Sequence, residues 1–423
     1  MPTWLIVLIT AAVTWVLIIL IRQFTAPEKA ISHELDHRYG VEDEQFLRSM
    51  GSLLPPALLG GNRITPLLNG DQIFPAMLEA IRSAKRNVNF ETFIYWQGDI
   101  GQAFADALIE RSRAGVQVNV LLDWLGSNRL DPKMLDQLKQ AGADVQRYHP
   151  LHWWNLHRAN NRTHRKLLII DGRLAFTGGV GIADEWTGNA QDPQHWRDSH
   201  YRLEGPAVAQ MQAAFMDNWL KTHSKVLHGE EYFPRLEPAG DLLAQMFMSS
   251  PEEGSESIRL MYLLSITAAK RSLRIGTAYF VPDNLAVDTL VAAKRRGVQV
   301  EIIVPGEHID THVVRRASRS RWGKMLEAGI EIYEYQPTMY HTKVMVVDDL
   351  WVSVGSTNFD NRSFRLNDEA NLNLYDAELA AHETHCFEQD KSRSKRITFE
   401  QWKNRPLREK LIEHAAGLLR LQM

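Results

Sequence analysis

Two copies of one short pattern constrain the fold of this 423-residue chain more than any other feature of its sequence. Each copy reads His-x-Lys, then four apolar residues, then Asp. The copies supply His164, Lys166 and Asp171 in the first half and His341, Lys343 and Asp348 in the second. Alternate side chains of an extended segment point to one face, so the histidine and lysine of each copy share a face. The apolar residues predict a buried strand in each copy, which the aspartate ends.

The sequence around the two motifs also repeats, with a nearly constant offset. Residues 113–118 resemble residues 295–300, and residues 140–145 resemble residues 327–332. The glycines in these matches are separated by 182 residues (297 − 115) and 187 residues (329 − 142), and the motif histidines by 177 residues (341 − 164). Such self-similarity predicts the duplication of a whole structural unit. If the two units pack face to face, both histidines and both lysines converge on one point.

Strands and helices alternate within each unit. In the first half, helical spacing and apolar strands occur in turn at residues 71–86, 88–95, 102–114, 116–122 and 132–141. This alternation predicts an α/β fold in which each unit is a mixed sheet flanked by helices.

The domain boundaries follow from the repeats. The segment 221–256, rich in proline and charge, separates the two units. We place the first domain at residues 62–235, the second at residues 236–376 and a C-terminal helical segment at residues 377–423. Within that segment, residues 405–421 mix leucine with arginine and lysine, so this helix either lies on a membrane surface or packs on the second domain.

The N-terminus predicts a transmembrane helix over residues 1–24. The run 4–21 is apolar apart from two threonines, and its length of about 27 Å is close to the hydrocarbon thickness of a bilayer. A cleaved signal peptide would require a basic segment before the apolar run, and no basic residue precedes this one. Arg22 and further basic residues follow it, which predicts that the rest of the chain lies in the cytoplasm. Residues 25–61, which end in a stretch of prolines and glycines, are predicted to be a linker.

Composition bears on the partners and on the redox chemistry. The formal net charge of −3 lacks the basic balance typical of a nucleic-acid-binding protein, so we expect no nucleic-acid partner. The single cysteine, Cys386, excludes an internal disulfide and a cysteine-rich zinc site. Because the motif lysines supply fixed positive charge, we also expect no metal and no cofactor.

The motif pair resembles the two His-x-Lys-x4-Asp motifs of the phospholipase D superfamily. The phrases at residues 196–200, 203–206 and 361–367 are similar, more narrowly, to those of bacterial cardiolipin synthases. The resemblance runs from about residue 62 to the C-terminus. It implies two phospholipase D-like α/β domains and a transferase in the bacterial inner membrane with a single span. Such an enzyme moves a phosphatidyl group between two phosphatidylglycerol molecules and releases glycerol.

The motif residues suit this chemistry. Neutral imidazole is a nucleophile and a proton carrier near pH 7, because its ordinary pKa is about 6.5. One histidine can attack phosphorus and form a phosphohistidine, while the other protonates the leaving oxygen and later deprotonates the incoming alcohol. The resemblance implies that His164 attacks and that His341 is the acid and base. Lys166 and Lys343 are expected to neutralise the phosphate oxygens.

Further site residues are expected around each motif. As phosphate donors we expect the Ser356 hydroxyl, the Asn358 amide and the backbone N–H groups near Gly178 and Gly179. The resemblance implies that Glu369 orients the second histidine and that Asp198 is its counterpart in the first half. We interpret Asp171 and Asp348 mainly as structural residues that close the strand ends.

One departure from the family pattern and several alternatives stay open. The family has Gly-Gly-x-Asn after the first motif, whereas this chain has Gly181 in place of the asparagine. The same site could serve a phospholipase D that transfers to water, or a transferase that uses another alcohol. A nuclease and a catalytically inactive scaffold are further alternatives, the latter because of Gly181. A membrane span favours a phospholipid over DNA. The oligomeric state stays unknown.

Overall fold

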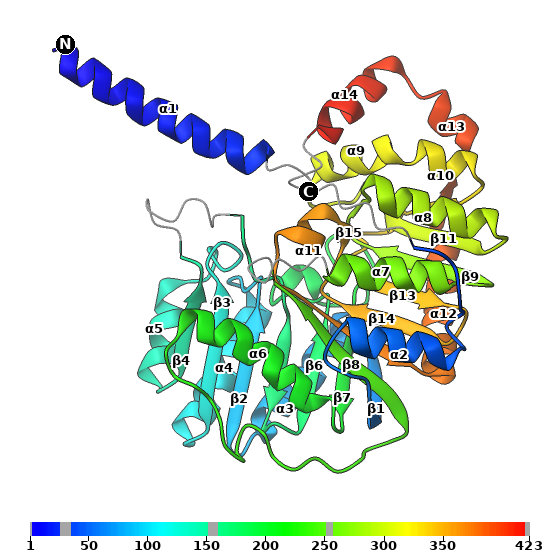
Figure 1. Ribbon diagram of the computed structural model, residues 1–423. Helices are drawn as coiled ribbons and strands as arrows, with labels where there is room; N and C mark the ends of the chain where they lie inside the picture. Colours follow the sequence, from blue (N-terminus) through cyan, green and yellow to red (C-terminus); the bar gives the residue numbers. More distant parts are fainter. Residues whose placement is uncertain (1, 26–34, 151–159, 251–256, 419–423) are drawn as a thin grey trace.

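The structure is a computed structural model that describes residues 2–25, 35–150, 160–250 and 257–418. One sheet of 15 strands runs through both repeats (Figure 1). The first repeat forms β1 (Leu59–Leu68), β2 (Asn87–Thr92), β3 (Gln117–Asp123), β4 (Asp144–Tyr148), β5 (Leu167–Ile170), β6 (Leu174–Gly178) and β7 (Ser199–Glu204). The second forms β8 (Leu242–Ser249), β9 (Ser272–Thr277), β11 (Gln299–Pro305), β12 (Glu331–Tyr335), β13 (Lys343–Val347), β14 (Trp351–Gly355), β16 (Glu369–Tyr375) and β17 (Ser394–Ile397). The short strands β10 (Phe280–Val281) and β15 (Phe359–Asp360) pair separately.

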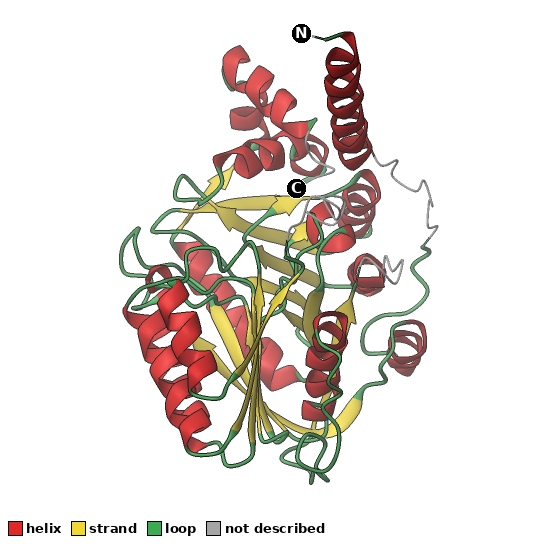
Figure 2. Ribbon diagram, turned by 90° about the vertical axis from the view of Figure 1, so that its left-hand side faces the viewer, coloured by secondary structure: helices red, strands yellow, loops and turns green. Residues whose placement is uncertain are grey.

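Helices lie on both faces of the sheet (Figure 2). In the first repeat they are α3 (Asn69–Ser83), α4 (Asp99–Arg113), α5 (Pro132–Gln140) and α6 (Val208–Thr222). The second repeat contributes α7 (Ser257–Ala268), α8 (Asn284–Arg295), α9 (His312–Arg321), α10 (Gly323–Glu327), α11 (Asn361–Arg365) and α12 (Ala377–Ser392). Two further helices, α13 (Phe399–Lys403) and α14 (Leu407–Gly417), follow, and α14 packs on α9. The predicted α/β fold with a mixed sheet flanked by helices is confirmed.

The strand order repeats outward from the centre of the sheet. One half reads β1-β7-β6-β5-β2-β3-β4, and the other reads β8-β16-β14-β13-β9-β11-β12-β17. In both halves three strands are parallel (β2, β3, β4 and β9, β11, β12), while the strands nearer the centre pair antiparallel. The halves join where β1 pairs antiparallel with β8. The two copies of the unit therefore lie edge to edge, with their first strands in contact.

The matched glycines explain how each repeat turns from helix to strand. Gly115 follows α4 with φ = 87°, and Gly297 follows α8 with φ = 97°. L-residues with a side chain rarely adopt this left-handed conformation, which glycine reaches without a steric penalty. Each glycine ends its helix two residues before β3 or β11 begins. The predicted order of helices and strands in residues 71–141 is confirmed.

A shared apolar core joins the two halves. One buried cluster contains Leu167 and Ala175 from the first repeat together with Val346 and Leu372 from the second. Helices α6 and α12 contribute buried side chains to the same cluster. Two further clusters each lie mainly within one repeat. Because the shared cluster is continuous, the junction between the halves is part of the folded core.

The structure differs from the predictions on either side of the repeats. The predicted linker contains α2 (Glu44–Leu53), whose Phe46 and Met50 are fully buried, and Phe46 meets Trp351 edge to face at 5.0 Å. The prolines that follow end this helix, while the apolar spacing within it gives it a face to bury. The C-terminal segment, predicted to be helical, includes β17, which extends the sheet by pairing with β12.

The N-terminal residues form α1 (Thr3–Thr25), and many of its apolar side chains are exposed. Among the residues described by the structure, no helix combines the length and the apolar character that crossing a membrane requires.

Candidate active site

Each motif segment contacts the half of the molecule to which it does not belong. The backbone N–H of His164 donates to the carbonyl of Asp368 at 2.8 Å, and the N–H of His341 donates to the carbonyl of Arg197 at 2.8 Å. Asp368 and Arg197 directly precede the two predicted orienting acids. Each motif segment is therefore fixed beside the acid-bearing strand of the other repeat.

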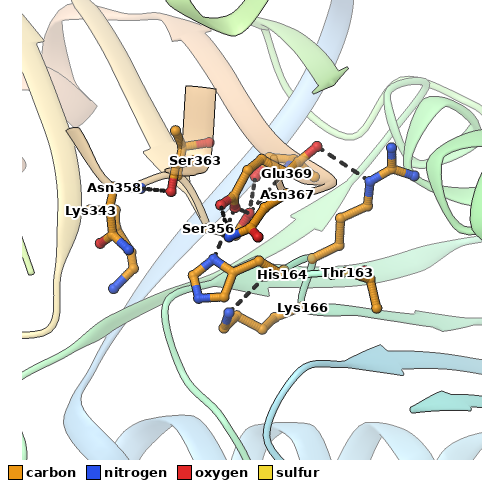
Figure 3. A network of polar contacts seen from close by, with 12 residues as sticks. Thr163, His164, Lys166, Lys343, Ser356, Asn358, Ser363, Asn367 and Glu369 are labelled. Carbon is orange, nitrogen blue, oxygen red and sulfur yellow. Dashed lines mark hydrogen bonds and ion pairs between the residues drawn. The ribbon is translucent and has the colours of Figure 1, made fainter. Parts of the chain in front are cut away.

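The carboxylates pair with the histidines across the junction. His164 Nδ1 lies 3.0 Å from Glu369 Oε2 (Figure 3). His341 Nδ1 lies 2.7 Å from Asp198 Oδ2. This corrects the assignment of each acid to the histidine of its own half, because the backbone contacts above place each motif against the other repeat. A hydrogen bond at Nδ1 fixes the ring and leaves Nε2 available for chemistry. Neither half therefore holds both a motif histidine and the carboxylate that contacts it.

Each motif lysine bends back to its own histidine. Lys166 Nζ donates to the carbonyl of His164 at 2.7 Å, and Lys343 Nζ donates to that of His341 at 2.6 Å. Lys343 Nζ also lies 3.1 Å and 3.2 Å from the two ring nitrogens of His341. Burial lowers the pKa of Lys166 to about 7 and that of Lys343 to about 8, with nearby carboxylates opposing the effect. Both ammonium groups are buried where a phosphate anion would stabilise their charge.

The two histidines share one electrostatic environment. Burial lowers the pKa of His164 to about 4 and that of His341 to about 3, although the paired carboxylates oppose this. The positive charge of each lysine also acts on the histidine of the other half. Lys343 lowers the pKa of His164, and Lys166 lowers the pKa of His341. Both imidazoles are therefore neutral at pH 7. The two motifs therefore lie close enough for the charge of each lysine to act on the histidine of the other half.

The two acids are stabilised by different groups. Burial would raise the pKa of Glu369, but His164, Lys166 and a hydrogen bond from Ser356 hold it below its usual value. The Ser356 hydroxyl donates to Glu369 Oε2 at 2.5 Å. In the other pair, the indole N–H of Trp186 donates to Asp198 Oδ2 at 2.9 Å. The hydroxyl that we predicted to bind phosphate therefore positions the acid in this arrangement.

The first glycine pair leaves room for the Asp198 carboxylate beside the backbone. The N–H of Gly179 donates to the carbonyl of Ser199 at 3.1 Å, so the sheet already uses it. A Cβ atom at Gly179 would lie 2.2 Å from Asp198 Oδ1, and one at Gly178 would lie 2.5 Å from the Ser199 carbonyl. The glycines therefore admit the Asp198 carboxylate close to the backbone, and the N–H of Gly179 already donates within the sheet.

The space that the family asparagine would need is occupied. A Cβ atom at Gly181 would lie 2.8 Å from Ile94 Cβ and 3.2 Å from the ring of Trp186. Its counterpart Asn358 is buried, and its Oδ1 has no hydrogen-bond partner among the described residues. Trp186 thus fills the position next to Gly181 and donates to the acid. The sequence analysis missed this tryptophan, because it lies outside both motifs.

Aromatic rings line the two histidines. Phe93 meets His164 edge to face with the ring centres 5.3 Å apart. Trp186 and Trp196 lie 5.2 Å and 5.5 Å from His341. These rings remove water from the imidazoles, which is the physical cause of their lowered pKa values. Among the described residues, no group of three or more His, Cys, Asp or Glu side chains could hold a metal ion.

The motif aspartates lie at the strand ends, away from the histidines. Each accepts hydrogen bonds from three consecutive backbone N–H groups, at residues 85–87 for Asp171 and at residues 270–272 for Asp348. Both adopt a left-handed backbone, with φ = 54° and 52°. These contacts anchor the strands β5 and β13 that follow the histidine and lysine residues.

Arg165, between the motif histidine and lysine, ties the halves together. It is fully buried and forms an ion pair with Asp217 at 2.9 Å. It also donates to the carbonyls of Ala214 at 2.7 Å and Ser249 at 3.1 Å, which belong to different repeats. The second motif has Thr342 at this position, so the repeat comparison gave no signal for this arginine.

The sequence matches the family described as "Cardiolipin synthase, PLD-like domain" over residues 77–219 and 262–391, one motif in each stretch. The chain belongs to this family. "Cardiolipin synthase 1" of Bacillus anthracis is 35% identical over 362 residues, which cover 84% of this chain and 71% of the relative. "Major cardiolipin synthase ClsA" of Bacillus subtilis (strain 168) is 37% identical over 362 residues, covering 85% of this chain and 75% of the relative.

A solved structure supports the family fold. The crystal structure of phosphatidylserine synthase from Haemophilus influenzae Rd KW20 superposes with a TM-score of 0.69 at 14% identity, covering 90% of this chain and all of the other. At this identity the likeness concerns the fold alone. The phospholipase D-like arrangement expected from the sequence is confirmed.

Proposed function

We propose that this chain is a membrane-bound phosphatidyltransferase of the cardiolipin synthase type. It moves a phosphatidyl group between two phosphatidylglycerol molecules and releases glycerol. The observation that carries the proposal is the pair of neutral histidines, each held at Nδ1 by a carboxylate of the other half, with two lysines beside them. The family of the chain and the names of its relatives support the substrate class.

In the first step, His164 Nε2 attacks the phosphorus of phosphatidylglycerol. The bond between phosphorus and the headgroup glycerol oxygen breaks, and His341 gives that oxygen a proton. A neutral His164 is ready to attack, since burial lowers its pKa to about 4. Glu369 stabilises the positive charge that develops on the ring. The phosphatidyl group is now attached to His164.

His341 needs the substrate to act as an acid. Burial and the adjacent Lys343 lower its pKa to about 3 in the free site. A phosphodiester anion between the lysines offsets their charge, so the pKa of His341 rises when substrate binds. Asp198 favours the protonated ring in the same way. The substrate itself therefore prepares the proton donor.

In the second step, His341 removes the proton from a headgroup hydroxyl of the second phosphatidylglycerol. The resulting oxygen attacks the phosphorus, the bond to His164 breaks, and cardiolipin leaves. His164 returns to its neutral form, and His341 is protonated again for the next round. Two phosphatidylglycerol molecules give one cardiolipin and one glycerol.

The membrane part of the proposal rests on the sequence. The apolar run 4–21 has the length of a bilayer span, and Arg22 follows it. We assign this run as a single anchor in a bacterial inner membrane, with the catalytic halves in the cytoplasm. Protease accessibility of residues 35–60 in right-side-out and inverted vesicles tests the orientation, because the two vesicle types expose opposite sides.

The central experiment supplies purified full-length chain with labelled phosphatidylglycerol in mixed micelles. We expect cardiolipin and glycerol in equal amounts, suppression of conversion by added glycerol, and a base-stable, acid-labile phosphorus label on His164. His164→Ala is the matched inactive control. Phosphatidic acid as the sole lipid product would instead identify a hydrolase. Cleavage of DNA without lipid turnover would identify a nuclease, and the absence of any turnover by both wild type and His164→Ala would leave a scaffold.

A further inference from the structure

Helix α14 has two chemically different faces. On the inner face, Glu413 forms an ion pair with Arg319 of α9 at 2.9 Å and another with Arg405 at 2.6 Å. Ala416 and Glu413 are buried against the protein, and Ile412 is partly buried. These contacts hold α14 on the second repeat, as one of the two sequence readings expected. They leave the opposite face of the helix free.

That outer face carries a stripe of exposed leucines. Leu407, Leu411 and Leu418 are 76%, 71% and 73% exposed. Their spacing of four and seven residues places them within a sector of about 40° on an α-helix. Three large apolar side chains on one sector of a stably packed helix cost free energy in water unless something covers them.

Basic residues border the stripe on both sides, while the acids of α14 are on its inner side. Arg408 and Lys410 directly flank the sector of the leucines. A hollow of about 480 Å³ beside it is lined by Lys403, Lys410 and Arg405 together with two of the leucines, and none of the described residues that line it is acidic. Glu409 and Glu413 line a separate cavity toward α9, where Arg316 and Arg319 face them. On α14 itself the acids therefore face the protein, while Arg408 and Lys410 border the leucines.

We propose that α13 and α14 dock on the surface of an anionic phospholipid bilayer. The leucines enter the boundary between headgroups and acyl chains, and the basic residues around them bind lipid phosphates. Apolar side chains flanked by cations fit a charged bilayer surface, where both kinds of group are satisfied at different depths. The two helices lie at the same end of the molecule as α1 (Figures 1 and 2). This surface is separate from the histidine site and does not depend on its chemistry.

The test places a polarity-sensitive dye on the stripe of the full-length chain. Cys386 is buried, so the background is Cys386→Ala, and the dye is attached through Leu411→Cys. The matched control is Val226→Cys, an exposed apolar position in the loop after α6. Each protein is reconstituted in vesicles of phosphatidylcholine, with or without phosphatidylglycerol.

We expect a blue shift and quenching by brominated lipid at position 411 only in the vesicles that contain phosphatidylglycerol, and neither change at position 226. Lys403→Gln with Lys410→Gln should remove the shift while phosphatidyl transfer in mixed micelles stays unchanged. An absent shift, or an equal shift in phosphatidylcholine alone, overturns the proposal. A shift in detergent that grows with protein concentration also overturns it, because a second copy of the chain then covers the leucines. If the lipid-dependent shift occurs without any lipid turnover, the docking surface stands and the proposed catalytic function fails.

Discussion

The two halves of the site hold the same hydrogen bond by different means. Glu369 contacts His164 and accepts a hydrogen bond from the Ser356 hydroxyl. The shorter Asp198 contacts His341 and accepts a hydrogen bond from the Trp186 indole. Gly179 stands where the other half has Ser356, and a side chain there would collide with Asp198. In the half-site with the shorter acid, Asp198, a glycine replaces the serine, and the hydrogen bond to the acid comes from Trp186, which lies outside the motif.

This comparison shows what a duplicated site preserves. The histidine, lysine and aspartate of each motif recur at matched positions, and so do the strands that carry them. The residues around the acids have diverged, because each acid requires only a hydrogen-bond donor and enough space. We therefore expect the two halves to differ in function where their surroundings differ.

The largest effect should come from the histidines, and an activated substrate separates them. A phosphodiester with a nitrophenolate leaving group needs no proton from His341, since nitrophenolate leaves as an anion. We expect His341→Ala to release about one equivalent of nitrophenol in a burst and then stall, while His164→Ala releases none. On phosphatidylglycerol both should lose activity by a factor of roughly 10⁴ or more. A burst from His164→Ala and none from His341→Ala would exchange the two roles.

The acids should show the crossed pairing in kinetics. Glu369→Gln weakens the support of His164, so we expect a slower burst with the activated substrate. Asp198→Asn weakens the support of His341, so the burst should stay fast while turnover on phosphatidylglycerol falls. Each loss should be roughly 10²–10⁴-fold, the range of general acid–base catalysis. If Asp198→Asn slowed the burst and Glu369→Gln left it fast, each acid would act on its own half and the crossed arrangement would be wrong.

The donors to the acids come next in size. Ser356→Ala and Trp186→Phe each remove one hydrogen bond to a buried carboxylate, a loss of about 1.5–3 kcal/mol, or roughly 10–150-fold. We expect Ser356→Ala to act on the burst and Trp186→Phe to act on later turnover. Ser356→Thr, which keeps the hydroxyl, is the matched control. If Ser356→Ala and Trp186→Phe slowed the burst equally, the donor in each half-site would affect both histidines, and the two half-sites would not act separately.

Much of this site could be predicted from the sequence, since the motifs and their spacing fix strand position and side-chain face. The pattern predicts that His164 and His341 converge only if the two units pack face to face, whereas the units lie edge to edge in one sheet. The crossed acids do not follow from the pattern, because a repeat within one chain gives no direct information on which half packs against which. The roles of Trp186 and Arg165 were also not predicted, because neither residue recurs at the matching position of the other half. Helix α2 was missed because the neighbouring prolines and glycines dominated the local signal.

The pH profile should separate the two lysines. Below its pKa each lysine is a cation, so phosphate binding is strongest at low pH and weakens as the pH rises. Lys166, with a pKa of about 7, should lose its charge before Lys343, with a pKa of about 8. Because the first step also requires a proton on His341, whose pKa is about 3 in the free site, we expect kcat/KM to fall about tenfold per unit above pH 5 and more steeply once a lysine deprotonates. The value of kcat should change less, because bound phosphate keeps the lysines charged.

Lys166→Arg tests the assignment of the alkaline limb, since arginine stays charged and should move the steeper fall toward higher pH. His164 is neutral above a pKa of about 4, so no acid limb is expected between pH 5 and 7. A limb near pH 6.5 would mean that the histidines titrate as they do in water. That result would contradict the buried environment on which both half-sites depend.

The smallest effect concerns Gly181, the point where the first half departs from the family pattern. Gly181→Asn forces a Cβ to within 2.8 Å of Ile94, and overpacking of this kind costs about 1–3 kcal/mol of stability. We expect a lower midpoint of thermal unfolding, partly restored by Ile94→Ala in the same chain. Gly60→Asn, where a Cβ meets only Leu243 at 3.6 Å, is the control. A Gly181→Asn variant as stable as the wild type and more active would show that the first half has room for the family's asparagine amide. In that case Trp186 would only replace the missing amide as a donor, and its ring would not be what excludes the asparagine.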